Sequence, residues 1–174
     1  MNPFSALVDL IYPRHCMACG GPVGEEGGYV CWDCMIRVDT VAAPFCRICG
    51  DPVDGVADHD YVCAWCTDSP PWFDLARSAA RYRGPLRRLL HAFKYEGGVC
   101  LCGDLVRYLD ACLTAQYGAV RPDAVAAVPL HPRKERERTY NQSALLAGAL
   151  ARRRGWPLLR RCLARTRETA TQTH

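Results

Sequence analysis

Eight of the twelve cysteines stand in four Cys-x-x-Cys pairs in the first part of the chain. Two thiolates at this spacing can bind one side of a metal ion, and two such pairs complete a tetrahedral zinc site. Gaps of eleven and thirteen residues separate the first pair from the second and the third from the fourth, which is typical of a zinc ribbon. We therefore predict two structural zinc ions, bound by these residues: Cys16, Cys19, Cys31, Cys34, Cys46, Cys49, Cys63 and Cys66.

Other uses of these cysteines stay open at this point. Iron in a rubredoxin-like site takes the same four thiolates, whereas a thioredoxin-type redox pair needs a single Cys-x-x-Cys on a βαβ frame. The pairs could also be crossed, so that Cys16 and Cys19 share an ion with Cys46 and Cys49. The motif C-x-x-C-G-x-P-V begins at both Cys16 and Cys46, and this internal repeat favours two consecutive ribbons.

A second group of residues able to do chemistry lies around the segment 123–142. Its apolar run 124–128 predicts a buried strand, which Pro129 and Pro132 end because proline has no backbone N–H. In open α/β sheets, a loop leading from such a strand into a helix binds phosphorylated ligands. The candidate phosphate or nucleic-acid residues are Lys94, Arg133, Lys134, Arg136, Arg138, Asn141 and Gln142.

A plainer interpretation of this segment is a solvated surface. Glu135 and Glu137 alternate with the basic residues and would pair with them weakly. Lys94 falls late in a predicted helix, where a cation is favourable in any case. Asn141 could simply cap the helix that follows it.

The charges divide the chain into two parts. Residues 1–74 hold three basic and eleven acidic residues, whereas residues 75–174 hold nineteen basic and seven acidic ones. Phosphate contacts need Lys and Arg, so the acidic part is predicted to be a structural or protein-docking module. The basic part is the candidate for binding single-stranded DNA.

The remaining elements follow from hydrophobic periodicity. A short amphipathic helix is predicted over 1–13, the double zinc ribbon over 14–70 and an α/β domain over 71–174. Within that domain we predict a strand at 75–82, helices from Gly84-Pro85, over 99–117 and over 142–154, and a last strand at 156–163. No apolar run approaches the roughly 20 residues of a membrane span. With no basic leader at the N-terminus, we expect a cytoplasmic location.

These motifs, taken in order, resemble the ComF family. The chain shares with it the double zinc ribbon and four further segments: Y-x-G-x-L-x-x-L-x-x-x-x-K-Y at 82–95, V-P-L-H-P at 128–132, R-x-R-x-Y-N-Q at 136–142 and L-x-R-x-R-x-T-x-x-Q at 163–172. One small departure is Thr139, where the family usually has glycine, which would matter if that position needs a positive φ.

The resemblance implies a cytosolic bacterial protein with a type I phosphoribosyltransferase-like, Rossmann-like fold behind the zinc ribbons. Some members act in uptake of single-stranded DNA during competence, alongside a helicase-like translocase, which the acidic zinc head would contact. In that fold, a strand ending in two acidic residues and a Thr/Gly-rich loop bind the sugar diphosphate. No such motif follows Asp123, so we expect a chain truncated at the C-terminus, without transferase activity. Magnesium, and an active phosphoribosyltransferase, are expected only in a form extending beyond His174.

Overall fold

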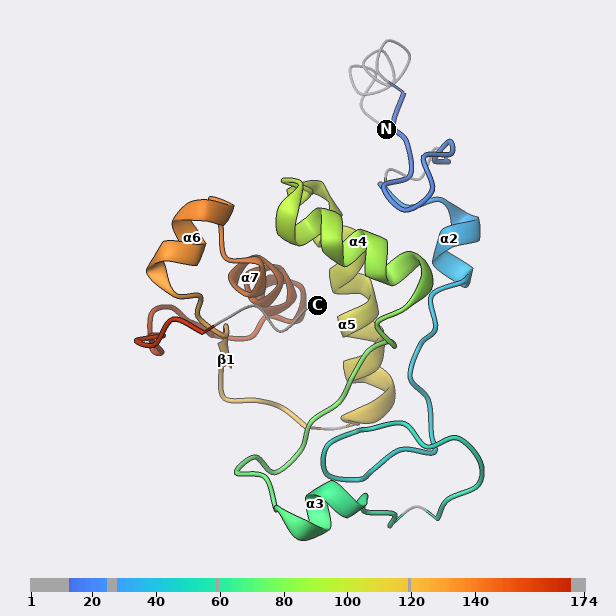
Figure 1. Cartoon of the computed structure of the whole chain (residues 1–174), viewed down its shortest axis with the longest axis vertical. Helices are drawn as coiled ribbons and strands as arrows, with labels where there is room; N and C mark the ends of the chain where they lie inside the picture. Colours follow the sequence, from blue (N-terminus) through green and yellow to red (C-terminus); the bar gives the residue numbers. More distant parts are fainter. Residues whose placement is uncertain (1–12, 25–27, 59, 119, 170–174) are drawn as a thin grey trace.

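The computed structural model describes residues 13–24, 28–58, 60–118 and 120–169 (Figure 1). Apart from Pro13, the helix predicted over 1–13 lies outside the described residues. Across the described part of the chain, no helix combines the length and the apolar composition needed to cross a membrane.

Two helices form the centre of the molecule. Helix α4 (Gly84–Tyr95) begins with Pro85 in its first turn and buries one apolar stripe that includes Leu89 and Phe93. Helix α5 (Cys102–Gln116) follows a 3-10 turn, η1 (Val99–Leu101). Both helices match the sequence-based prediction, since proline suits a first helical turn and the apolar residues recur every three to four positions.

The first zinc ribbon shares a hydrophobic core with these helices. Its short helix α2 (Trp32–Ile36) lies beside α4 and the upper part of α5 (Figure 1). Tyr108 on α5 donates a hydrogen bond to the carbonyl oxygen of Met35 at 3.3 Å, and Gln116 donates to Val41 at 2.7 Å. The common core consists of Cys16, Ala18, Val30, Cys34, Val38, Leu86, Leu89, Ala92, Phe93, Leu101 and Leu105.

The second zinc ribbon is held by a backbone hydrogen bond and by two arginine side chains, of which Arg81 pairs with Asp54 at 3.1 Å. It contains helix α3 (Ala64–Asp68) and lies beyond the lower end of α5 (Figure 1). The amide of Ala76 donates to the carbonyl oxygen of Ile48 at 2.8 Å, and Arg77 donates to Arg47 at 3.1 Å. Its buried cysteines are not members of the core shared by the first ribbon and α4–α5. The two ribbons are therefore attached to the body in different ways.

The α/β part of the described chain is one parallel pair of strands with a helix between them in sequence. Strand β1 (Val125–Ala126) pairs with β2 (Leu158–Leu159), and α7 (Gln142–Arg154) lies between them in the chain. The side-chain oxygen of Asn141 caps α7 by accepting hydrogen bonds from the amides of Ser143 and Ala144. Gly155 ends the helix in the left-handed conformation, with φ 68°. The predicted helix and both caps are confirmed. The described residues contain no larger sheet, so the fold is a double zinc ribbon followed by mixed helices and strands.

Two sequence-based predictions about secondary structure are wrong. Residues 75–82 form no strand and make only one antiparallel bridge, between Ala80 and Thr40. The predicted loop after Pro132 is a helix, α6 (Pro132–Arg138). Proline fits its first turn, the residues after it are good helix formers, and Arg133 pairs with Glu137 one turn later at 3.2 Å. The two predicted strands near 124–128 and 156–163 are present but shorter.

Thr139 ends α6 in the left-handed region, with φ 66° and ψ −13°. A β-branched residue there is strained by about 1–2 kcal/mol. Glycine removes this strain, but part of the gain is lost because glycine gives the unfolded chain more conformational entropy. We expect Thr139→Gly to raise the free energy of unfolding by about 0.5–1 kcal/mol in urea titrations. Thr139→Ala serves as the control, since it keeps the strain. A destabilised glycine variant would show that the threonine hydroxyl, which donates to Arg138 at 2.6 Å, outweighs the strain.

Asp110 joins α5 to α7. It accepts a hydrogen bond from Arg153 at 2.7 Å and another from Arg154, which also donates to the Asp110 carbonyl oxygen at 2.8 Å. The Arg153 hydrogen bond, against some opposing burial and together with Arg154, lowers the pKa of Asp110. A lowered pKa contributes stability that is full above the ordinary carboxyl pKa of about 4 and is lost as the pH falls below it.

We therefore expect the free energy of unfolding to fall between about pH 5 and pH 3. The Asp110→Asn variant should be less stable at neutral pH and should lose part of this dependence. Chemical unfolding of both proteins across this range measures the difference. Parallel pH profiles would show that the Asp110 ion pairs do not stabilise the contact between the two helices.

Candidate metal centres and cationic cavities

The first metal centre is built from two tight turns that each supply two thiols. In the first turn, the amide of Cys16 donates to Gly21 at 2.8 Å, and the amide of Gly20 donates back to Cys16 at 2.7 Å. Gly20 adopts φ 76°, a conformation that glycine accepts without strain. The second pair stands at the N-terminus of α2, where Cys31 is the N-cap. The four ligands are Cys16, Cys19, Cys31 and Cys34, whose sulfur atoms all lie within 4.8 Å of one another.

The second centre repeats this geometry. Here the amide of Cys46 donates to Asp51 at 2.8 Å, Gly50 donates to Cys46 at 2.9 Å, and Cys63 is the N-cap of α3. The Phe45–Pro52 bridge matches the His15–Pro22 bridge of the first ribbon. The four ligands are Cys46, Cys49, Cys63 and Cys66. The internal repeat found in the sequence is therefore a structural repeat, and crossed pairing of the cysteines is excluded.

Both centres fit zinc. The Cys19 and Cys31 sulfurs lie 3.7 Å apart, as do those of Cys49 and Cys63. Four zinc–sulfur bonds of 2.3 Å in a tetrahedron place the sulfurs about 3.8 Å apart. With the double zinc ribbon motif, this defines two structural zinc sites, each with four protein ligands and no open position for a reacting molecule.

The thiols of each cluster differ in their readiness to ionise. Burial acts to raise the pKa of Cys16 and Cys46, but backbone N–H groups directed at their sulfurs outweigh it and hold each pKa at about 6. Burial and the neighbouring thiols raise the pKa of Cys34 and Cys66 to about 12. Four thiolates this close repel one another, so a bound divalent cation is needed to keep them all ionised.

The predicted phosphate candidates divide into two groups in space. Lys94, near the end of α4, meets Lys134 and Arg138 of α6 in a cavity of about 220 Å³. All three cations are half-buried. We call this space the α4–α6 cavity; its lining residues are Lys94, Tyr95, Gly97, Lys134, Glu137 and Arg138.

The other candidates serve different contacts. Arg133 is exposed and pairs with Glu137 and with Glu168, the latter at 3.5 Å. Gln142 accepts a hydrogen bond from Arg138 at 3.1 Å, so it positions that guanidinium. Asn141 caps α7 with its oxygen and donates its nitrogen to Val128 at 3.1 Å. Arg136 is exposed on α6.

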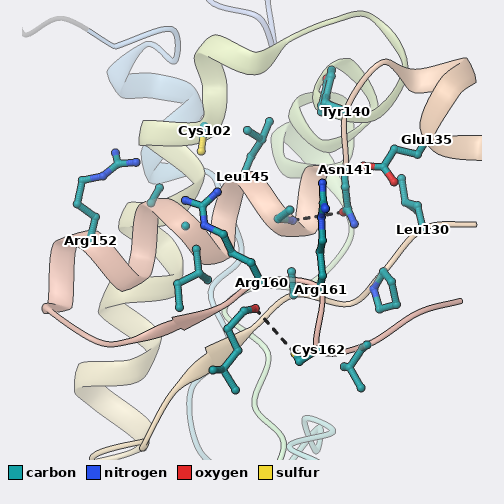
Figure 2. A pocket seen from close by; sticks show the side chains of 18 of the residues that line it. Cys102, Leu130, Glu135, Tyr140, Asn141, Leu145, Arg152, Arg160, Arg161 and Cys162 are labelled. Atoms are coloured by element: carbon teal, nitrogen blue, oxygen red, sulfur yellow. Dashed lines mark hydrogen bonds between the residues drawn. The ribbon is translucent and has the colours of Figure 1, made fainter. Parts of the chain in front are cut away.

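A larger cavity of about 810 Å³ lies where β1 and β2 end, beside α7. Figure 2 shows Arg160 and Arg161 extending from the segment after β2 into this space, with Arg161 beside Asn141 and Arg160 directed toward Leu145. Its volume falls within the range of small-molecule sites. Arg160 and Arg161 are absent from the sequence-based candidates. Since parallel strands end at one edge of a sheet, residues following the second strand could have been placed beside those following the first.

Two four-cysteine centres in consecutive hairpins define a double zinc ribbon protein, and residues 7–69 match the family model described as a double zinc ribbon domain. The whole chain is also similar to curated proteins. It is 31% identical over 168 residues to DNA utilization protein YhgH of Salmonella typhimurium, covering 95% of this chain and 72% of that protein. It is 29% identical over 162 residues to Competence protein F of Haemophilus influenzae, covering 90% and 68%.

Similarity extends to Competence protein ComFC of Bacillus subtilis, with 26% identity over 143 residues, 75% of this chain and 55% of that protein. No solved structure matches the chain significantly. Because the match to the Salmonella protein covers nearly all of this chain at 31% identity, the chain belongs to the ComF family.

Proposed function

We propose that this protein is a cytoplasmic DNA-handling accessory of bacterial competence. In this proposal the basic body (residues 71–174) holds single-stranded DNA through phosphate contacts, and the acidic zinc head (residues 14–70) docks a protein partner. The observation that carries the proposal is the separation of charge: residues 1–74 hold eleven acidic and three basic residues, against seven and nineteen in the rest of the chain.

Metal binding increases this separation. Four thiolates on one divalent ion leave a charge of about −2 at each centre, so zinc makes the head more negative still. DNA phosphates are repelled by such a surface and attracted to Lys and Arg. The names of the relatives, DNA utilization protein and Competence protein F, agree with a role in DNA handling.

The salt dependence of binding tests the proposed function. A labelled single-stranded oligonucleotide is titrated with the full zinc-loaded chain, and fluorescence anisotropy gives the affinity at each salt concentration. If four phosphates are contacted, affinity should fall about 50-fold between roughly 50 and 200 mM salt. Absence of binding at low salt, or an affinity that salt does not change, would refute the proposal.

The head offers exposed aromatic residues for a protein partner. Trp32 on α2 is 70% exposed and Trp65 on α3 is 59% exposed; Asp33 directly follows Trp32, and Asp68 lies three residues after Trp65 on the same helix. Tryptophan is enriched at interface hot spots, and the acidic surroundings favour a basic partner surface. The helicase-like translocase of competence is the proposed partner. Loss of its binding in Trp65→Ser, measured by calorimetry with both purified proteins, is the expected result.

A second candidate function is phosphoribosyl transfer in a longer form of the chain. It is supported by the parallel β1–α7–β2 unit, with a cavity of about 810 Å³ where its strands end, because open α/β sheets bind phosphorylated ligands at that edge. This unit would be part of a phosphoribosyltransferase-like sheet. Magnesium and phosphoribosyl diphosphate should then raise the melting temperature of the longer form. An unchanged melting temperature would remove this candidate.

A further inference from the structure

The α4–α6 cavity joins cations from two helices that are far apart in sequence. Lys94 lies forty residues before Lys134, yet both line the same space with Arg138. Tyr140 brings the helices together, since its hydroxyl donates to the carbonyl oxygen of Phe93 in the last turns of α4. A volume of about 220 Å³ is below that of sites for whole drug-sized ligands. It suits a small anionic group, such as one phosphate with its nearest sugar atoms.

Arg138 is held in place before any ligand arrives. Its guanidinium lies 4.8 Å from the centre of the Tyr95 ring and donates to the Tyr95 hydroxyl at 3.3 Å. A further N–H donates to Gln142. Arginine carries five N–H donors, so several stay available to an oxyanion. A side chain fixed in this way loses little entropy on binding.

The two lysines also keep donors for a ligand. Lys134 gives one hydrogen bond, to the carbonyl oxygen of Thr169 at 2.7 Å, out of the three that an ammonium can make. Lys94 lies 5.8 Å from the centre of the Tyr82 ring. Within the described ranges, neither lysine nor Arg138 has a carboxylate at ion-pair distance. The acid in the lining, Glu137, is already paired with Arg133.

Helix dipoles do not account for all three cations. A cation near a helix C-terminus is stabilised, which explains Lys94 in the last turn of α4 and Arg138 at the end of α6. Lys134 lies in the first turn of α6, where the dipole is positive and a cation is disfavoured. The residue is half-buried and its ammonium donates to the carbonyl oxygen of Thr169, and an anion in the cavity would offset the unfavourable position of this charge.

Half-exposed aromatic rings flank the cations. Tyr82 is 49% exposed and Tyr95 47% exposed. Unpaired bases stack on such rings, and grooves that combine cations with aromatic side chains are typical of single-strand binding. Bases within a duplex are not available for this contact. The cavity and Tyr82 thus supply the two contacts that a single nucleotide of an unpaired strand makes.

We propose that the α4–α6 cavity binds one backbone phosphate of single-stranded DNA through Lys94, Lys134 and Arg138, and that Tyr82 stacks an adjacent base. This inference rests on the proposed DNA-handling function and assigns it to one place on the body. The chemistry recognised is a phosphate group, which a DNA strand or a free compound such as inorganic pyrophosphate can supply. The experiment below separates these two sources.

The test compares double variants of equal charge in the full zinc-loaded chain. Lys94→Gln with Lys134→Gln removes two cavity cations, while Arg87→Gln with Arg88→Gln removes two exposed cations from α4 outside the cavity. Oligothymidine binding is measured by anisotropy across a salt series. The cavity variant should lose about tenfold or more in affinity at low salt, with a log–log salt slope about 0.7 smaller than in the wild type, because one phosphate contact is lost. The control should change little.

A third variant isolates the stacking contact. Tyr82→Leu should weaken oligothymidine binding about tenfold with an unchanged salt slope. The inhibition constant of pyrophosphate, measured by displacement of the oligonucleotide, should stay the same as in the wild type. Melting temperature and a zinc content of two ions per chain confirm that each variant is folded.

The possible failures are distinct. If the wild type binds oligothymidine but the cavity and control variants weaken it equally, the site is wrong while the proposed function stands. If the wild type binds no oligothymidine at low salt, both are wrong. If pyrophosphate binds in a manner that needs Lys94 and Lys134 but does not displace the oligonucleotide, the cavity serves a free phosphate compound and the inference is overturned.

Discussion

Cys34→Ser should unfold the basic body, whereas Cys66→Ser should disturb only the second zinc ribbon. The two cysteines are matched: each is the last ligand of its centre, lies on the short helix of its ribbon and is at most 2% exposed. They differ in their surroundings. Cys34 belongs to the hydrophobic core that includes Leu89 and Phe93 of α4, and Cys66 does not.

The expected difference is large. A structural zinc ion contributes about 10 kcal/mol or more to folding, which is comparable to the whole stability of a typical domain of about 5–15 kcal/mol. Loss of the first centre exposes its share of the core packed on α4 and α5. We expect Cys34→Ser to lower the melting temperature by more than about 15 °C or to abolish cooperative unfolding. Cys66→Ser should retain one zinc ion and a nearly unchanged transition for the body.

Hydrogen exchange read by mass spectrometry locates the effect. Amides of α4 and α5 should lose protection in Cys34→Ser and keep it in Cys66→Ser, while peptides of the second ribbon show the reverse. Zinc content, measured on the same samples, should be one ion in Cys66→Ser. Equal loss of protection in α4 and α5 for both variants would contradict the unequal attachment of the two ribbons.

Asp104→Ala should weaken the attachment of the first zinc ribbon to α5. Asp104 is 5% exposed, lies in the first turn of α5 and accepts the amide of Tyr29 at 2.9 Å. Its removal leaves that N–H without its partner and takes a favourable negative charge from the helix N-terminus. We expect a loss of about 3 kcal/mol in the free energy of unfolding, and about 1 kcal/mol for the isosteric control Asp104→Asn.

Gly28 provides a second check on this contact. A Cβ at Gly28 would lie 2.8 Å from one Asp104 carboxylate oxygen, so Gly28→Ala should be destabilising in the wild type. In the Asp104→Ala background, the same change should cost markedly less, because the clashing oxygen is gone. A double-mutant cycle from denaturant titrations measures this coupling. Additive effects would show that Gly28 and Asp104 do not meet.

Features set by local sequence could be predicted, and those set by distant contacts could not. The eight zinc ligands and the caps of α7 at Asn141 and Gly155 follow from spacing and residue type alone. The segment 75–82 has an alternating pattern, yet the one bridge it makes within the described part of the chain depends on Thr40, which that pattern does not reveal. Likewise, the basic residues after Pro132 are predicted to form a loop because Pro129 and Pro132 follow the strand. In the structure, Pro132 is the first residue of helix α6.

The candidate site shows the same division. Lys94 and the cations of α6 could each be singled out from the sequence, but their meeting depends on the Tyr140–Phe93 contact between distant segments. The half-exposed rings of Tyr82 and Tyr95 carried no sequence signal that distinguished them from core aromatics. Arg160 and Arg161 lie inside the predicted strand 156–163, but because β2 already ends at Leu159, they follow the strand and line the larger cavity.

The central claim is that the basic body, and not the zinc head, holds single-stranded DNA. Ultraviolet cross-linking of oligothymidine to the full zinc-loaded chain, followed by mass spectrometry of the linked peptides, tests it most directly. We predict cross-links in the peptides that contain Tyr82 and Tyr95, weakened by high salt. Cross-links confined to the peptides of Trp32 and Trp65, the exposed tryptophans of the head, would contradict the claim.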